Sequence, residues 1–342
     1  MKRKSLIEIA KDKYKEGKRL VAPLLGFPGV ELIGSNIKIA QQNYGEHYKV
    51  LKILVEKFNP DVIFPLMDLS VEANALGRFT VFPREDSATV PKDKFDINEL
   101  DRIASINISF DSRINGYVNT VKLMKIGLPE DVIKGAYVTG PYSVAALLMG
   151  ADEAAMASIL EPEKLRKICD ITTEKIQEYV NMLISAGADI ICVLEPTAVM
   201  LGPEQFRNFS AHYVRHIVES CIYSGVNTVY HTCGNTMHLL NEMVNAGVDG
   251  LSLDSKEVGV DLKEAAKILT KDVVLIGNIS PTNTILRGTP DEVKEEVSNL
   301  LKEMDPYPNF ILSTGCDLPQ ETPEANIKAF IETGKNYRIP KK

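Results

Sequence analysis

Residues 227–234 read Asn-Thr-Val-Tyr-His-Thr-Cys-Gly, a short run rich in β-branched and apolar residues that ends in a polar motif. The run follows Gln205–Ser224, a longer stretch that opens after Pro203-Glu204, with the proline and early acid typical of a helix start. A short strand-like run after a longer helix-like stretch is the repeating unit of α/β proteins. This stretch therefore predicts a parallel sheet whose strands are connected by helices.

The same alternation recurs along the chain, and about eight strand-like runs predict a TIM (β/α)8 barrel. The expected strands are Leu20–Gly26, Asp61–Asp68, Gly135–Gly140, Ala188–Glu195, Asn227–His231, Val248–Asp254, Val273–Asn278 and Asn309–Cys316. After the second strand, residues 79–134 form a long segment with a helix expected around residues 117–126. Because insertions after barrel strands usually cover the site, we predict one barrel over residues 1–342, roofed by residues 79–134.

Composition limits the classes of function. The chain has 342 residues, of which 44% are hydrophobic and 25% charged, as in ordinary globular proteins. Its net charge of −7 argues against nucleic acid or an anionic membrane as the main partner, because both favour clustered Lys and Arg. We see no signal peptide and no apolar stretch of membrane-spanning length. Five cysteines without a secretion signal therefore predict free thiols in the cytoplasm.

His231, Cys233 and Cys316 are the candidate metal ligands. Alternate residues of a strand share a face, so His231 and Cys233 are expected to point the same way. Cys316 ends another strand-like run, and the carboxyl ends of barrel strands meet at one face of the barrel. One imidazole and two thiolates suit Zn²⁺, and three protein ligands leave a position open for a reactant, as in catalytic zinc sites. The competing interpretation is that both cysteines are small buried apolar residues.

Polar residues at other expected strand ends extend this candidate site. Glu195 is a predicted catalytic residue, with three open roles: a fourth metal ligand, a general base, or a hydrogen-bond partner that orients His231. Asp68 and Asp254 are further catalytic candidates that either hold substrate, bind a cation or cap the helix that follows. Gly140 and Asn278, also at strand ends, are candidate substrate-binding positions.

Several spaced motifs carry a resemblance to a known family. They are Val138-Thr-Gly-Pro-Tyr-Ser143, Glu195-Pro196, His231-Thr-Cys-Gly-Asn-Thr236, Gly277-Asn-Ile-Ser-Pro281 and Gly315-Cys-Asp-Leu-Pro319. In this order they resemble the uroporphyrinogen decarboxylase superfamily, and within it the corrinoid-dependent methyltransferases typified by methylcobalamin:coenzyme M methyltransferases. The true decarboxylases differ, since they carry an Arg-rich stretch where this chain has Leu25–Val30 and a histidine where it has Cys316.

The resemblance implies a zinc ion held by His231, Cys233 and Cys316 that activates a small thiol for attack on the methyl group of methylcobalamin. Two thiolate ligands reduce the positive charge of the ion, which favours a reactive sulfur over water activation. None of the five histidines has Asp two residues before it, so the chain lacks the Asp-x-His-x-x-Gly motif that holds a corrinoid. The corrinoid is therefore expected as a free cofactor or on a separate protein.

Other functions remain as alternatives. A related corrinoid-dependent demethylase takes a methyl group from a small methoxy or methylammonium compound, and Asp317 stands where the coenzyme M enzymes tend to have a second glycine after the cysteine. A uroporphyrinogen decarboxylase and a non-catalytic relative are further alternatives. His212 and His216 are spaced one helical turn apart, but Tyr213 replaces the Glu of the metalloprotease motif, so we interpret them as ordinary helix residues.

Overall fold

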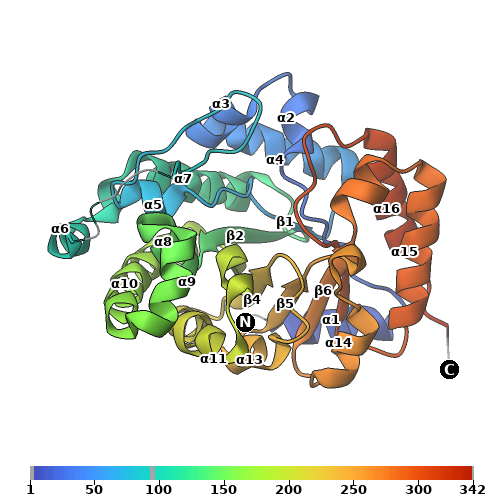
Figure 1. Cartoon of the computed structure of the whole chain (residues 1–342). Helices are drawn as coiled ribbons and strands as arrows, with labels where there is room; N and C mark the ends of the chain where they lie inside the picture. The colour runs from blue at the N-terminus through green and yellow to red at the C-terminus, as the bar shows by residue number, and fades with distance from the viewer. Residues whose placement is uncertain (1–3, 93–95, 97, 341–342) are drawn as a thin grey trace.

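A curled sheet of seven parallel strands lies at the centre of the computed structural model, which describes residues 4–92, 96 and 98–340 (Figure 1). The strands are β1 (Val62–Ile63), β2 (Ile133–Thr139), β3 (Ile190–Leu194), β4 (Asn227–Thr232), β5 (Gly250–Leu253), β6 (Val274–Ile279) and β7 (Phe310–Thr314). Each pairs in parallel with the next along the chain. The sheet order is therefore the chain order, as a (β/α)8 barrel requires.

The expected first strand, Leu20–Gly26, closes the barrel between β7 and β1. Val21 forms an isolated parallel bridge with Leu312 of β7, and its carbonyl accepts a hydrogen bond of 2.9 Å from the Asp61 amide next to β1. The segment contains Pro23, and β1 is followed by Pro65, so neither can continue a regular ladder because proline has no N–H. The prediction of a TIM barrel is confirmed, with its eighth strand position reduced to this bridge.

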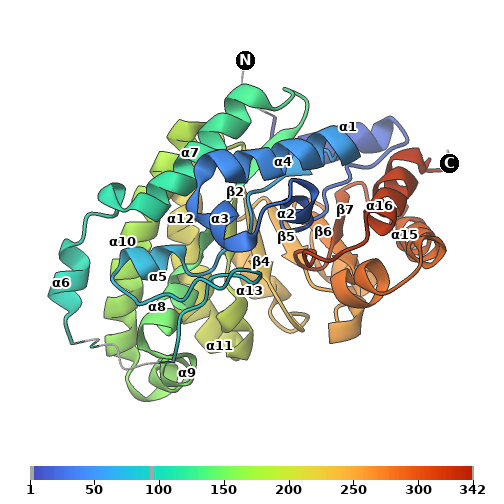
Figure 2. The same ribbon diagram turned by 90° about the horizontal axis from the view of Figure 1, so that it is seen from above.

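The described residues form helices, most of which surround the sheet on its outer face (Figures 1 and 2). They are α1 (Leu6–Lys15), α2 (Pro28–Leu32), α3 (Ile37–Gln42), α4 (Tyr44–Phe58), α5 (Val71–Ala75), α6 (Leu100–Ser105), α7 (Ser112–Gly127), α8 (Pro141–Met149), α9 (Ala151–Leu160), α10 (Pro162–Ala186), α11 (Pro203–Phe206), α12 (His212–Ile222), α13 (Leu240–Asn245), α14 (Leu262–Ile268), α15 (Pro290–Met304) and α16 (Glu324–Asn336). Short 3-10 turns are η1 (Ile108–Phe110), η2 (Pro196–Met200) and η4 (Lys256–Val258), and π-helical turns are η3 (Arg207–Ala211) and η5 (Pro281–Leu286). The outer ring closes where α16 packs against both α15 and α4.

Two apolar layers form the core. The outer one lies between the strands and the helices, and the inner one fills the barrel. Leu6 and Ala10 of α1 belong to the inner layer, so α1 lies across the end of the barrel opposite the carboxyl ends of the strands. A capping box of Ser5 and Glu8 starts α1, and the Leu6 amide donates a hydrogen bond of 2.7 Å to Asn227 at the start of β4. The open end of the barrel is therefore the end where the strands finish.

The predicted insertion, residues 79–134, does not form one separate unit. Its helix α7 packs between α4 and α10 in the outer ring, whereas α6 lies at the opposite side of the molecule from α15 and α16 (Figures 1 and 2). Residues 93–95 and 97 of the segment lie outside the described residues. Its role as a roof over the site stays a prediction.

Within the described part of the chain, no single helix has the length and apolarity to cross a membrane. The pair α8 and α9 reaches that length and composition together but is bent by 109°.

Candidate metal centre at the carboxyl ends of the strands

His231, Cys233 and Cys316 meet at the open end of the barrel. His231 lies near the end of β4 on the inner face, two residues after the inward-facing Val229, and Cys233 lies just beyond the strand. Cys316 follows β7 by two residues. His231 Nε2 is 3.3 Å from Cys233 Sγ and 3.8 Å from Cys316 Sγ, and the two Sγ atoms are 3.5 Å apart. Residues 85 positions apart in the chain thus present three donor atoms to one point.

The three donors fit a zinc ion. A tetrahedral zinc with Zn–S of about 2.3 Å and Zn–N of about 2.0–2.1 Å places its ligand atoms roughly 3.5–3.8 Å from one another. The observed separations agree with this spacing, and all three donor atoms lie within 4.8 Å of one another. In the metal-free protein the hydrogen bond with Cys233, together with burial, raises the pKa of the Cys316 thiol well above its usual range. A cation at this point would favour the thiolate form of a cysteine that binds it.

Asp254 and Asn278 hold the backbone around this cluster. The Asp254 carboxylate accepts a hydrogen bond of 2.7 Å from the amide of Gly234, the residue after Cys233. Asn278 donates from its side chain to the carbonyls of Asp254 (2.8 Å) and Val260 (2.9 Å). Both side chains are buried, and their polar atoms form hydrogen bonds with backbone groups of the neighbouring loops. These contacts assign them a part in shaping the turn that carries Cys233.

Glu195 lies beside the cluster but is engaged with another element. Its carboxylate accepts hydrogen bonds from the amides of Tyr142 (3.1 Å) and Ser143 (2.8 Å) in the first turn of α8. A helix N-terminus stabilises negative charge, yet complete burial raises the pKa of Glu195 to about 7. A Cβ atom at Gly140 would lie 2.3 Å from the Glu195 side chain, so glycine there makes room for the carboxylate. The Nδ1 atom of His231 contacts Ser252 Oγ at 3.0 Å.

Asp68 belongs to a second, buried polar group. It pairs with Arg113 at 2.5 Å and accepts hydrogen bonds from the Ser70 hydroxyl (2.6 Å) and the Tyr117 hydroxyl (3.0 Å). The Arg113 guanidinium also packs over the ring of Phe82. The carboxylate is thus neutralised by a cation from α7, which the sequence pattern did not indicate as its partner.

Sequence reasoning did not select three polar residues near the strand ends as site residues; Ser252 and Glu72 are buried and Asp317 is partly exposed. Ser252 lies on β5, Glu72 on α5 accepts a hydrogen bond of 2.8 Å from the Thr139 amide, and Asp317 follows Cys316. Burial raises the pKa values of Glu72 and Asp317 to about 7. Ser252 lies two residues before Asp254 on the same expected strand, so alternation alone could have placed the two on one face.

A cavity of about 420 Å³ is lined in part by Asp317, the residue that follows Cys316. Acidic side chains supply much of its polar lining: Glu85, Asp86, Asp317 and Glu321. Its other lining residues are Phe27, Ile37, Ser87, Leu318, Pro319 and Gln320. Residues 85–87 come from the segment predicted to roof the site. Among the described residues that line the cavity, four are acidic and none is lysine or arginine, and one of the acids, Glu85, is paired with Arg84 at 3.0 Å.

The fold and the cluster together define a (β/α)8-barrel protein that gathers three metal-ligating side chains at the carboxyl ends of its strands. The chain belongs to the uroporphyrinogen decarboxylase family, whose family model matches residues 41–337. The resemblance seen in the sequence motifs is therefore confirmed.

Relatives within this family differ in their named activities. The methylcobamide:CoM methyltransferase MtbA of Methanosarcina acetivorans is 26% identical over 245 residues, which cover 71% of this chain and 69% of that protein. The uroporphyrinogen decarboxylase of Prochlorococcus marinus strain AS9601 is also 26% identical, over a match that covers 81% of this chain and 80% of that protein. Among solved structures, a methyltransferase from Methanosarcina mazei superposes with a TM-score of 0.82 at 23% identity, covering 95% of this chain and 97% of that one. This last likeness is one of fold.

Proposed function

We propose that this protein is a zinc-dependent methyltransferase that moves a methyl group between a corrinoid, methylcobalamin, and a small thiol such as coenzyme M. The observation that carries the proposal is the set of three donor atoms, His231 Nε2 and two cysteine Sγ atoms, 3.3–3.8 Å apart at the open end of the barrel. Similarity to a methylcobamide:CoM methyltransferase supports the reaction class. Decarboxylase activity, the named activity of the other relative, is less well supported, because this chain has no Arg-rich stretch in Leu25–Val30.

In this proposal His231, Cys233 and Cys316 hold the zinc ion. When bound, zinc supplies a Lewis acid that lowers the pKa of a thiol entering its open position. Asp254 and Asn278 keep the Cys233 turn in place through their hydrogen bonds to Gly234 and to loop carbonyls. Preorganised ligands of this kind reduce the reorganisation needed when the substrate arrives.

The remaining predicted residues have contacts that favour indirect roles. Glu195 and Gly140 fix the start of α8, and Asp68 is paired with Arg113. We keep Glu195, Asp68 and Asp254 as proposed catalytic residues and Gly140 and Asn278 as proposed substrate-binding positions. Their contacts support positioning as the means by which they act.

The corrinoid is proposed to come from outside the chain, free or on a separate protein. The sequence has no Asp-x-His-x-x-Gly motif to hold one. All five cysteines are free thiols, which supports a reducing, cytoplasmic environment.

One observation favours a second candidate, a corrinoid-dependent demethylase acting on a methylammonium compound. Four acidic residues line the cavity beside Asp317. Glu85 is paired with Arg84, and the pKa of Asp317 is raised to about 7. This leaves Asp86 and Glu321 to attract a cationic methyl donor and repel an anionic thiol. Coenzyme M carries a sulfonate, so the two candidates differ in the charge of their substrate.

X-ray absorption of the purified, metal-loaded protein, repeated after adding coenzyme M or another small thiol, separates the candidates. We expect zinc with two sulfur ligands, and a third sulfur after the thiol is added. Zinc that is indifferent to thiols but accompanied by turnover of a methylammonium compound would favour the demethylase. Absence of stoichiometric zinc after anaerobic purification and reconstitution would overturn both.

A further inference from the structure

Ser252 lies next to His231 on the inner face of the barrel. The two residues are register partners in the parallel pair β4 and β5, so the sheet itself holds their side chains together. Both are almost completely buried, with 2% of Ser252 and 1% of His231 exposed. The distance from Ser252 Oγ to His231 Nδ1 is 3.0 Å, which is that of a hydrogen bond.

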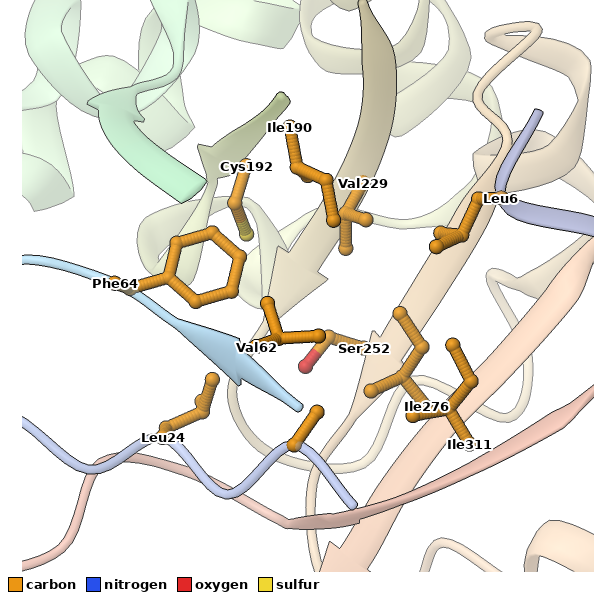
Figure 3. Close-up of a pocket in the computed structure, with 11 residues that line it drawn as sticks. Leu6, Leu24, Val62, Phe64, Ile190, Cys192, Val229, Ser252, Ile276 and Ile311 are labelled. Carbon is orange, nitrogen blue, oxygen red and sulfur yellow. The ribbon is translucent and has the colours of Figure 1, made fainter. Parts of the chain in front are cut away.

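The side chains around the Ser252 hydroxyl are mostly apolar, which favours its hydrogen bond with His231 Nδ1. Ser252 also lines a small closed cavity in the barrel, whose other walls are apolar side chains including Val62, Val229 and Ile276 (Figure 3). The volume is about 20 Å³, room for one water, but a water needs two to four polar partners. Among the described side chains that line this cavity, Ser252 carries the hydroxyl group and the rest are carbon or sulfur.

We propose that Ser252 is a positioning residue that presents the Nε2 atom of His231 to the metal; this inference rests on the proposed function. An imidazole that binds a metal through Nε2 carries its proton on Nδ1, and that proton needs an acceptor when it is buried. The Ser252 hydroxyl accepts it, and the same bond stops the ring from turning over. Because a hydroxyl can also donate, Ser252 satisfies Nδ1 in the metal-free protein as well.

Glu195 does not compete for this role in the structure. It follows the inward-facing Leu194, and its two carboxylate oxygens accept from amides at the start of α8. Glu195 was the partner that the sequence offered for orienting His231, and the geometry instead selects Ser252 on the neighbouring strand.

The test compares zinc affinity in Ser252→Ala, Ser252→Thr and a matched control, Ser313→Ala. Ser313 is a buried serine on β7 whose hydroxyl donates to the Ala22 carbonyl at 2.7 Å. We expect Ser252→Ala to weaken zinc binding about 10–100-fold, as removal of such partners typically does. Ser252→Thr keeps the hydroxyl and should stay near wild type, since the adjoining cavity has space for one methyl group. Ser313→Ala should bind zinc like wild type.

A second readout follows the Nδ1 proton directly. In ¹⁵N-histidine NMR spectra of the zinc-loaded protein, the Nδ1–H of His231 should be shifted downfield and protected from exchange in wild type and Ser252→Thr. In Ser252→Ala the Nδ1–H signal should lose both its downfield shift and its protection from exchange. Wild-type affinity in Ser252→Ala, or equal losses in Ser252→Ala and Ser313→Ala, would overturn the inference.

The outcomes separate this inference from the proposed function. If wild type binds no zinc, the proposed function fails; if wild type binds zinc and Ser252→Ala binds it equally well, only the role of Ser252 fails. Should Ser252→Ala not fold, Ser252→Cys retains the volume with a weaker acceptor and should show an intermediate affinity. A Ser252→Cys variant with unchanged affinity and unchanged Nδ1–H protection would then contradict the proposal.

Discussion

The two cysteines of the cluster differ from the other three cysteines in exposure. Cys233 and Cys316 are partly exposed, whereas Cys169, Cys192 and Cys221 are buried. Burial raises the pKa of Cys221 to about 12, and it raises the pKa values of Cys169 and Cys192 further above their usual range. Because the pKa of the Cys316 thiol is raised as well, the two groups differ in access: a reagent reaches Cys233 and Cys316 more readily than the three buried thiols.

Chelation should therefore change the reactivity of two thiols. In native protein treated with a chelator, we expect Cys233 and Cys316 to react with an aromatic disulfide reagent well before the other three. Added zinc should protect both. Peptide mass mapping after a short exposure identifies the modified residues, with labelling of Cys192 as the internal control. Reaction of Cys233 and Cys316 at the same rate with and without zinc would argue against metal binding.

Substitution of one ligand should remove the metal without unfolding the barrel. We expect Cys316→Ala to lose stoichiometric zinc and methyl transfer, because two protein ligands hold the ion far more weakly than three. The scaffold is preformed by strands and helices, so circular dichroism should remain that of wild type. The buried Cys221→Ala is the control and should retain zinc. Unfolding of Cys316→Ala, with Cys221→Ala folded, would instead indicate a structural metal.

At the scale of elements, the junction of β2 and α8 depends on one glycine and one acid. Gly140 follows β2 and is the N-cap of α8, and the carboxylate of Glu195, which follows β3, accepts hydrogen bonds from amides in the first turn of α8. The site residues predicted at these two positions are therefore partners of each other.

Gly140→Ala should destabilise the protein by about 1–3 kcal/mol, as overpacking of a filled interior does. The cause is the new Cβ atom, which would lie 2.3 Å from the Glu195 side chain. In a Glu195→Ala background the same change should cost less, with a coupling of about 0.5–3 kcal/mol. Urea denaturation of the four proteins measures this coupling. Gly116→Ala on α7, where a Cβ atom meets no neighbour within 4 Å, is the matched control and should not destabilise the protein. Additive costs at 140 and 195 would contradict the contact.

At the scale of the whole molecule, the stability should depend on pH through Glu72. This carboxyl group is buried, one of its oxygens has no hydrogen-bond partner, and burial raises its pKa from 4.5 to about 7. The folded state therefore holds a proton that the unfolded state has already released between about pH 4.5 and 7. Stability from this group is complete below pH 4.5 and falls as the pH rises to 7.

Glu72→Gln should remove this loss. Relative to wild type, the variant should gain free energy of unfolding as the pH rises from 5 to 8, on the order of 3 kcal/mol at most. Thermal or urea unfolding at each pH gives the difference, and subtraction of the two proteins cancels the pH dependence of metal binding. Glu295→Gln, an exposed substitution on α15, corrects for the change in net charge. A difference that is constant with pH would show that Glu72 is ionised in the folded state.

Local sequence predicted much of the fold because strand alternation and helix starts depend on neighbouring residues. Seven expected strands overlap β1 to β7, and the eighth, Leu20–Gly26, occupies the closing position. Pro23 and Pro65 explain why two of them are shorter than expected. The sequence also predicted His231, Cys233 and Cys316 as one set of candidate metal ligands, because the carboxyl ends of barrel strands lie at the same face of the barrel.

What only the tertiary structure decided is which side chains touch. The register of β4 with β5 sets Ser252 against His231, and α7 brings Arg113 to Asp68. The carboxylate of Glu195 turns to α8, although its place at a strand end equally suggested the metal. These pairings join residues separated by 21 to 52 positions, and no local pattern encodes the distance between them. The sequence by itself determined the strands, the helices and the types of metal-ligating residue. Tertiary packing determined which side chains contact each other, because contact depends on strand register and helix placement in three dimensions.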